Sequence, residues 1–198
     1  MAVRGKLSIK QLLKKNYSNS KVFRNLAYGA AKKKVKGLQN TALKEFDQHE
    51  VTKELEKGTS GMNSSLLGGR GNFFGFLGFH EGDQPVQIIR SILEDHIKIR
   101  NTKGKLKKVS ATSFQWDFDI DIPSKTEIYA VTPMVWSSKS WVKGVERGIT
   151  NYAKTVFRDS ERSRSGIALQ SRQNIGFITF RPTPYITALL DKLRKQLK

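Results

Sequence analysis

The sequence contains no cysteine, which excludes disulfide bonds, thiolate catalysis and zinc sites built on thiolates. It also has no apolar run near the roughly 20 residues that a membrane-spanning helix needs. Leu12 and Leu13 are followed at once by Lys14 and Lys15, so the N-terminus has no apolar signal-peptide core. These absences favour a protein assembled in the cytoplasm, with no part in a membrane.

Acidic residues are missing from the first 44 positions, which contain twelve lysines and arginines. The whole chain has 36 basic and 17 acidic residues and a net charge of +19. The charge is uneven, because residues 45–96 hold nine acids and four bases whereas residues 126–198 hold five acids and thirteen bases. Such one-sided charge indicates an anionic partner, and an acidic middle between basic ends predicts docking between copies and adjoining proteins.

Motifs for chemistry are few. His49, His80 and His96 stand far apart without the HxH or HExxH spacing of metal sites, and no GxSxG elbow occurs. Residues 69–75 are glycine-rich but lack the lysine and hydroxyl residue that end a phosphate-binding P-loop. We therefore expect no catalytic residue, metal or cofactor, and no enzymatic activity.

Three aspartates, Asp117, Asp119 and Asp121, alternate along the clearest strand pattern in the chain, residues 114–122. Aligned carboxylates can bind magnesium or calcium for a nuclease. Alternation also places polar residues outward on any half-buried strand, and three lysines lie close by in sequence. A solvated or salt-bridged face is the favoured interpretation.

The hydrophobic periodicity predicts an α+β fold with a long N-terminal helix, a small antiparallel sheet and flanking helices. Residues 1–19 are expected to form a basic arm that orders on contact, and residues 20–198 a single domain. Ser20 is positioned to cap a helix over residues 21–48. An amphipathic membrane helix is disfavoured there, because its apolar side holds many alanines.

Further elements follow from capping residues and from changes of period. Asp83 is expected to cap a helix over residues 84–96. The strand at 114–122 is expected to return along residues 127–132. The remaining predictions are a helix over 141–157, a basic loop over 158–166, strands over 167–170 and 175–181, and a final helix that starts after Pro182 and Pro184.

Residues 57–79 combine seven glycines with four phenylalanines. The glycines predict a loop, and the phenylalanines predict that it is anchored in apolar pockets, either of this subunit or of a neighbouring one. The candidates for a subunit interface are Phe73, Phe74, Phe76, Phe79 and Arg70.

Basic clusters supply candidates for binding nucleic acid or an acidic partner: Lys14, Lys15, Lys32, Lys33, Lys34, Lys36, Arg162 and Arg164. No recognition-helix or RNA-binding signature accompanies them. Any contact with DNA is therefore expected to involve its backbone, to weaken with salt and to be indifferent to sequence.

Four segments together resemble stretches of virion proteins of tailed bacteriophages, commonly small neck or tail-completion subunits. They are FDQHEVTKELEKG (46–58), GGRGNFFGFLGF (68–79), WVKGVERGITNYA (141–153) and SRSGIALQ (163–170). The similarity covers about residues 42–197 and leaves the basic arm outside. It implies a homo-oligomeric ring at the head–tail junction that joins the portal or adaptor to the tail around the DNA channel, with no catalytic residues to transfer.

Two alternatives stay open beside this reading. The first is a sequence-independent nucleic-acid-binding protein, and the second is a metal-dependent nuclease built on the three aspartates. Within the phage reading, tail-completion, tail-terminator and head-side adaptor roles are also left open.

Overall fold

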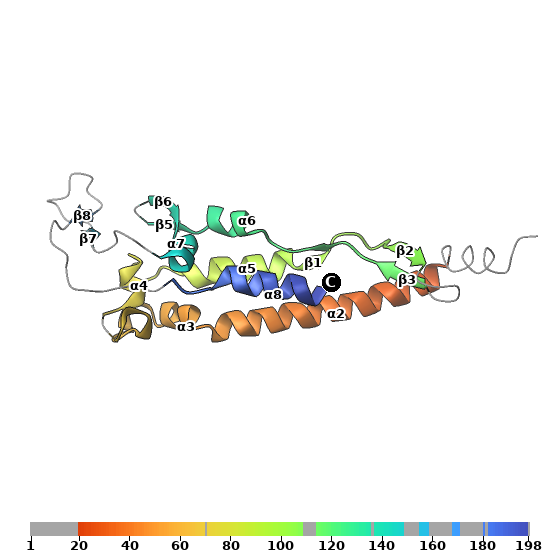
Figure 1. Cartoon of the computed structure of the whole chain (residues 1–198), viewed down its shortest axis with the longest axis horizontal. Helices are drawn as coiled ribbons and strands as arrows, with labels where there is room; N and C mark the ends of the chain where they lie inside the picture. The colour runs from red at the N-terminus through yellow and green to blue at the C-terminus, as the bar shows by residue number, and fades with distance from the viewer. Residues whose placement is uncertain are drawn as a thin grey trace, which may run out of the picture.

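The structure is a computed structural model of the chain. It describes residues 20–69, 71–108, 114–135, 137–148, 155–158, 168–170, 180 and 182–197. The predicted arm, residues 1–19, lies outside this range. The described part is elongated: one long helix runs along much of its length, and most other elements lie alongside the C-terminal half of that helix or beyond its end (Figure 1).

The long helix is α2, Lys21–Gln48, with the predicted bounds. Ser20 caps it as expected, because its side-chain oxygen accepts a hydrogen bond from the Phe23 amide at 3.5 Å. Its buried residues all belong to the second half: Val35, Gln39, Ala42 and Phe46. The first half therefore projects beyond the core, and among the described elements a β-hairpin lies beside it (Figure 1).

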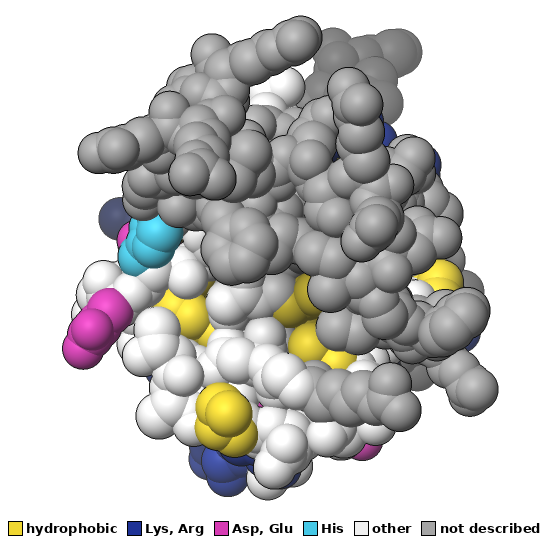
Figure 2. Space-filling model, turned by 90° about the vertical axis from the view of Figure 1, so that its left-hand side faces the viewer, with side chains coloured by type: hydrophobic (Ala, Val, Ile, Leu, Met, Phe, Trp, Pro, Cys, Tyr) yellow, Lys and Arg dark blue, Asp and Glu magenta, His cyan; other side chains and the backbone are white. Residues whose placement is uncertain are grey.

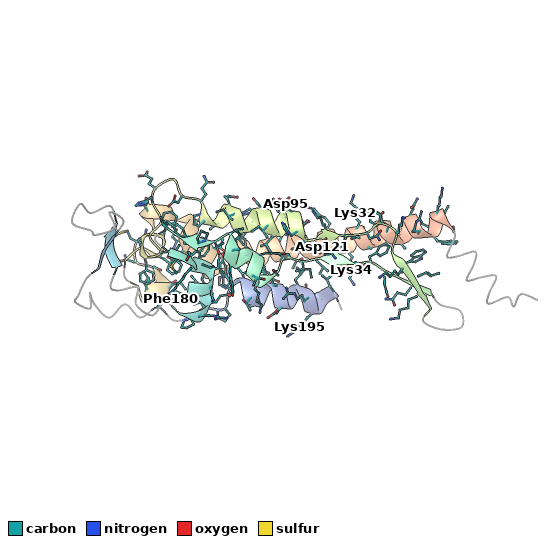
Figure 3. The ribbon with its side chains drawn as sticks, turned by 90° about the horizontal axis from the view of Figure 1, so that it is seen from above. Lys32, Lys34, Asp95, Asp121, Phe180 and Lys195 are labelled. Atoms are coloured by element: carbon teal, nitrogen blue, oxygen red, sulfur yellow. The ribbon has the colours of Figure 1, made fainter. Side chains whose placement is uncertain are left out.

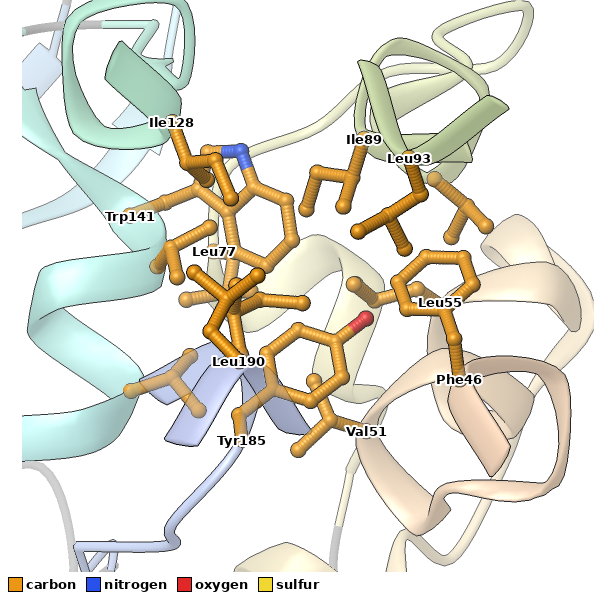
Figure 4. Packing of buried hydrophobic residues seen from close by; sticks show 14 of the residues in the cluster. Phe46, Val51, Leu55, Leu77, Ile89, Leu93, Ile128, Trp141, Tyr185 and Leu190 are labelled. Carbon is orange, nitrogen blue, oxygen red and sulfur yellow. The ribbon is translucent and has the colours of Figure 1, made fainter. Parts of the chain in front are cut away.

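The C-terminal half of α2 belongs to a compact end that contains the core. Short helices surround it: α3 (Glu50–Glu56), η1 (Gly58–Ser60), η2 (Ser65–Leu67), α4 (Phe73–Phe76), α5 (Pro85–His96), α6 (Lys125–Ala130), α7 (Trp141–Arg147) and α8 (Ile186–Leu197). Figure 4 shows side chains from several of these helices meeting around Trp141, Tyr185 and Phe46. Trp141 packs edge-on against Phe79, with ring centroids 5.8 Å apart.

The strands pair only in twos within the described residues, and each pair is antiparallel. The pairs are β1 (Lys98–Ile99) with β4 (Ile120–Asp121), β2 (Lys105–Lys108) with β3 (Phe114–Asp117), β5 (Pro133–Met134) with β6 (Ser137–Ser140), and β7 (Thr155–Arg158) with β8 (Ala168–Gln170). The α+β class is confirmed, with separate ladders in place of one small sheet.

The predicted continuous strand over residues 114–122 is wrong, because pairing stops at Phe118 and Asp119. Phe118 lies against Tyr28 of α2, with ring centroids 6.0 Å apart. Gly104, at φ 59°, passes so close that an added Cβ would stand 2.8 Å from the Phe118 ring. This packing divides the segment between two different partner strands.

The predicted return strand over residues 127–132 is also wrong, because α6 occupies this segment. The Ser124 hydroxyl accepts a hydrogen bond from the Glu127 amide at 3.1 Å, and a Glu127 carboxylate oxygen accepts one from the Ser124 amide at 2.8 Å. This reciprocal capping box satisfies two amides that would otherwise be unpaired at the helix start.

Two further boundaries differ from the predictions. Helix α7 ends at Arg147 instead of continuing to residue 157, because Gly148 takes φ 87° and leaves the helical region. Asp83 does not cap α5; Gln84 holds that position without a side-chain bond, and Asp83 accepts a hydrogen bond from the His80 amide at 2.7 Å. The predictions for residues 159–167 and 175–179 lie outside the described residues.

Candidate functional site

The projecting half of α2 and the hairpin beside it form a strongly basic surface. We call it the basic end. It is defined by Lys21, Arg24, Lys32, Lys33, Lys34 and Lys36 of α2, by Lys103 in the turn before β2, and by Lys105 and Lys107 of β2. All of these side chains are exposed except the half-buried Arg24. Helix α2 carries no acidic residue before Glu45, so the helix cannot neutralise its own lysines here.

The lysines of α2 surround the helix instead of forming a single row. Figure 3 shows Lys32 and Lys34 on opposite sides of α2. Lys36 donates a hydrogen bond to the Gln39 side chain at 2.9 Å, and Gln39 in turn donates to the Leu93 carbonyl at 3.3 Å. The predicted candidates Lys32, Lys33, Lys34 and Lys36 are all exposed, and they lie on different sides of the same stretch of α2.

The β2–β3 hairpin adds further lysines to this surface, and the contact of Phe118 with Tyr28 holds the end of β3 close to α2. Lys105 lies opposite Asp117 across the β2–β3 ladder, and Lys107 lies opposite Gln115. The Asp117 carboxylate accepts a hydrogen bond from the Gln115 amide group at 2.8 Å. One aspartate beside several lysines leaves the hairpin with a positive charge.

Some acidic side chains of the compact end form ion pairs within the chain. Arg90 of α5 contacts both carboxylate oxygens of Asp47, at 3.0 and 2.7 Å, and one oxygen of Glu56 at 3.0 Å. Its guanidinium carbon also lies 5.9 Å from the centre of the Phe46 ring. Lys192 of α8 pairs with Glu45 at 2.5 Å. These contacts join α2, α3, α5 and α8.

The phenylalanine segment belongs to the core of its own chain. Phe73, Phe74 and Phe79 are buried, and Phe73 stacks on Phe180 with ring centroids 5.5 Å apart. Phe76 is half-buried and also faces Phe180. The sequence left open whether the pockets for these rings belong to this subunit or to a neighbouring one, and for Phe73, Phe74 and Phe79 the packing lies within the same chain. Arg70 lies outside the described residues.

One carboxylate, Glu146, joins three helices through hydrogen bonds that the sequence did not predict. Glu146 of α7 accepts hydrogen bonds from the Thr187 amide at 2.6 Å, the Thr187 hydroxyl at 2.7 Å and the Tyr129 hydroxyl at 2.6 Å. Burial, followed by the bond to Glu146, raises the pKa of Tyr129. The carboxylate lies at the N-terminus of α8, where a negative charge is stabilised by the helix dipole. We call this arrangement the lock, because the Glu146 carboxylate holds α6 and α8 against α7.

His49 has a structural role between α2 and α3. Its Nδ1 accepts a hydrogen bond from the Val51 amide at 3.2 Å, and its Nε2 lies 3.0 Å from the Pro184 carbonyl oxygen. These contacts require the proton on Nε2, which donates to the carbonyl. The ring also lies 4.7 Å from that of Tyr185. This histidine holds the C-terminal segment against the bend between the helices.

The three aspartates do not share a strand face, because Asp117 belongs to β3 and Asp121 to β4. Asp121 pairs with Arg100, whose Nε donates to its carboxylate at 2.8 Å, and this bond raises the pKa of Arg100. For Asp121, this matches the salt-bridged interpretation. Across the described ranges, no group of three or more His, Cys, Asp or Glu side chains is arranged to hold a metal ion.

The surface of the compact end is mixed in character. Viewed from the compact end, the described atoms show apolar, acidic, histidine and a few basic side chains (Figure 2). Within the residues that the structure describes, no helix is both long and apolar enough to cross a membrane. The candidates Lys14, Lys15, Arg162 and Arg164 lie outside those residues.

Comparison with known proteins gives no relative: no protein-family model, no curated protein and no solved structure matches the chain. Function therefore has to be inferred from the residues themselves.

Proposed function

We propose that this protein is a structural subunit of a tailed-phage virion at the head–tail junction. In this role it acts by assembly, forming a ring that joins the head connector to the tail around the DNA channel. Its partners are further copies of itself, the portal or adaptor, and tail proteins. The observation that carries the proposal is the separation of charge along an elongated molecule.

Charge separation supports assembly because a closed ring needs two different, complementary faces on each subunit. The basic end offers exposed lysines on a helix that leaves the core, and the acid-rich segment 45–96 builds much of the compact end. Facing surfaces of opposite charge favour correct docking and disfavour contact between like ends. The four segments that resemble phage neck proteins give the finer assignment to a head–tail junction.

The basic arm offers a direct test of the assembly role. Deletion of residues 1–18 removes five basic residues and leaves Ser20 in place to cap α2. We expect the truncated chain to fold like the full chain by circular dichroism but to fail in joining heads to tails in a complementation assay. A matched variant replaces the five basic residues with glutamine in the full-length arm, which separates loss of charge from loss of length. Unchanged joining by the truncated chain would contradict the role of the arm.

The same basic end favours a second candidate function, sequence-independent binding of nucleic acid. The matched variants are Lys32, Lys33 and Lys34 changed to glutamine, against Lys53, Lys143 and Lys195, all exposed, changed to glutamine as a control. Binding to duplex DNA is measured over a range of salt concentrations. Losing three phosphate contacts should lower the slope of log K against log salt by about 2–3 for the first variant only. Absence of binding by the unmodified chain at low salt would eliminate this candidate.

A further inference from the structure

A stripe of exposed residues runs along α2 on the side away from the core. Val22, Leu26, Gly29, Lys33 and Gly37 follow one another at intervals of four, three, four and four residues, and all are exposed. The buried residues of α2, from Val35 to Phe46, occupy the other side of the helix. We call these five residues the α2 stripe.

The apolar residues of the α2 stripe have no role in the core. Val22 is 67% exposed and Leu26 is 65% exposed. Single exposed leucines are ordinary, but these two lie one helical turn apart and their side chains adjoin. Together they offer an apolar patch on a helix that also exposes Phe23 and several lysines.

The glycines of the stripe are likewise unexplained by the fold of one chain. Nothing outside the helix lies within 4 Å of a Cβ added at Gly29 or at Gly37, and neither has a positive φ. Glycine in a helix interior costs about 1 kcal/mol relative to alanine. Small residues let a second backbone approach closely, which gives these two positions a use in a contact with another chain.

A complementary stripe lies on α5 in the compact end. Gln84, at its N-cap, and Ile88, Ser91 and Asp95 recur at intervals of four, three and four, and all are exposed, whereas Val86, Ile89 and Leu93 face the core. Ile88 is 47% exposed. Among the ion pairs of the described residues, none involves Asp95 or its neighbour Glu94. This α5 stripe therefore combines one apolar side chain with free negative charge.

We propose that the α2 stripe of one copy docks on the α5 stripe of a second copy. The apolar residues Leu26 and Ile88 would then pack together, the small residues Gly29 and Ser91 would let the helices approach, and lysines of α2 would face Glu94 and Asp95. Two basic ends repel each other, so pairing α2 with α2 is disfavoured. The apolar pair and the glycines favour a protein surface over a nucleic-acid backbone. This inference rests on the proposed function, because it supplies the two faces that a ring requires.

The natural absence of cysteine makes the contact testable by disulfide trapping of the full chain. Gly29→Cys and Ser91→Cys are made as separate variants, mixed in equal amounts and oxidised mildly. We expect a disulfide-linked heterodimer in about tenfold higher yield than from Gly29→Cys mixed with Thr59→Cys, because docking raises the effective concentration of the paired thiols. Thr59 is exposed in η1 and provides the matched control.

Three outcomes would overturn the proposal. The first is a yield no higher than that of the control mixture, and the second is preferential pairing of Gly29→Cys with itself. The third is that duplex DNA protects the thiol at position 29 from alkylation whereas added unmodified protein does not. This result would assign the α2 stripe to nucleic acid. Circular dichroism of each variant verifies that it is folded.

The test separates this interface from the proposed function. Rings that form at the head–tail junction without the trapped contact between positions 29 and 91 would reject the interface and leave the function standing. A trapped contact in a chain that is located elsewhere than the junction would reject the function and leave the interface standing.

Discussion

The compact end and the basic end of this molecule use similar helices for different purposes. In the compact end, α2 buries Val35, Ala42 and Phe46 against α5 and α8, and ion pairs such as that between Lys192 and Glu45 join the elements. In the basic end the same helix buries little and carries lysines on most sides. Burial gives the compact end its stability, and the exposed half of the helix is available for partners.

The largest expected effect concerns the phenylalanine segment. Phe73→Ala should destabilise the isolated chain by about 3–5 kcal/mol, because it leaves a cavity beside Phe180 in the core. Leu26→Ala at the basic end is the control and should change stability by less than about 0.5 kcal/mol. Urea denaturation followed by tryptophan fluorescence measures both. Equally small losses of stability in the two variants would contradict the core position of Phe73 and would favour a role for it at a subunit interface.

The next effect concerns the lock between α7 and α8. Glu146→Gln should cost about 1–3 kcal/mol, because the one amide oxygen can accept from the Thr187 amide while an NH2 group replaces the oxygen that accepts from the Tyr129 and Thr187 hydroxyls. Tyr129→Phe removes one of these bonds and should cost less. Denaturation midpoints of the two variants give the order. A Glu146→Gln chain as stable as the unmodified one would show that the carboxylate is not a lock.

A stabilising change is expected at the basic end. Gly37→Ala should raise the free energy of unfolding by about 1 kcal/mol, because nothing outside the helix approaches the added Cβ. Gly148→Ala is the opposite control, since its φ of 87° makes any side chain strained. A Gly37→Ala chain that is less stable than the unmodified one would contradict the open surroundings of this position.

The smallest effect at neutral pH concerns Tyr185. Burial raises its pKa, so above pH 10 the unfolded chain loses the proton first and the folded state loses stability. Tyr185→Phe should flatten this alkaline decline, at a cost of about 1 kcal/mol near pH 7 from the lost bond to Thr52. Denaturation midpoints measured from pH 8 to 11 test this. An unchanged alkaline slope would mean that Tyr185 is more accessible than its packing indicates.

Local signals in the sequence predicted α2, α5 and α8, but not α3, α4 or α6. A capping serine and a regular apolar stripe indicated α2 with its observed bounds, and the pattern after Pro184 indicated α8. The Ser124–Glu127 capping box was an equally local signal for α6, but the apolar residues between Glu127 and Thr132 suggested a strand instead. Where cap chemistry and periodicity disagreed, the cap decided the structure.

The site was less predictable, because burial depends on distant parts of the chain. Sequence indicated that the phenylalanines of residues 57–79 are anchored, but only the fold assigns Phe73 to the core of its own chain. Glu146 and Thr187 meet across 41 positions, and no local motif indicates that pairing. The cluster Lys32–Lys36 was visible in the sequence, whereas its position on a projecting helix was not.

Location of the subunit in a particle tests the central claim most directly. A tag fused after Lys198, detected by electron microscopy of assembled virions, reports where the chain lies. We predict a single ring of label at the head–tail junction. Label spread over the capsid shell, or a chain found only outside particles, would contradict the assignment of this charge-separated protein to the phage neck.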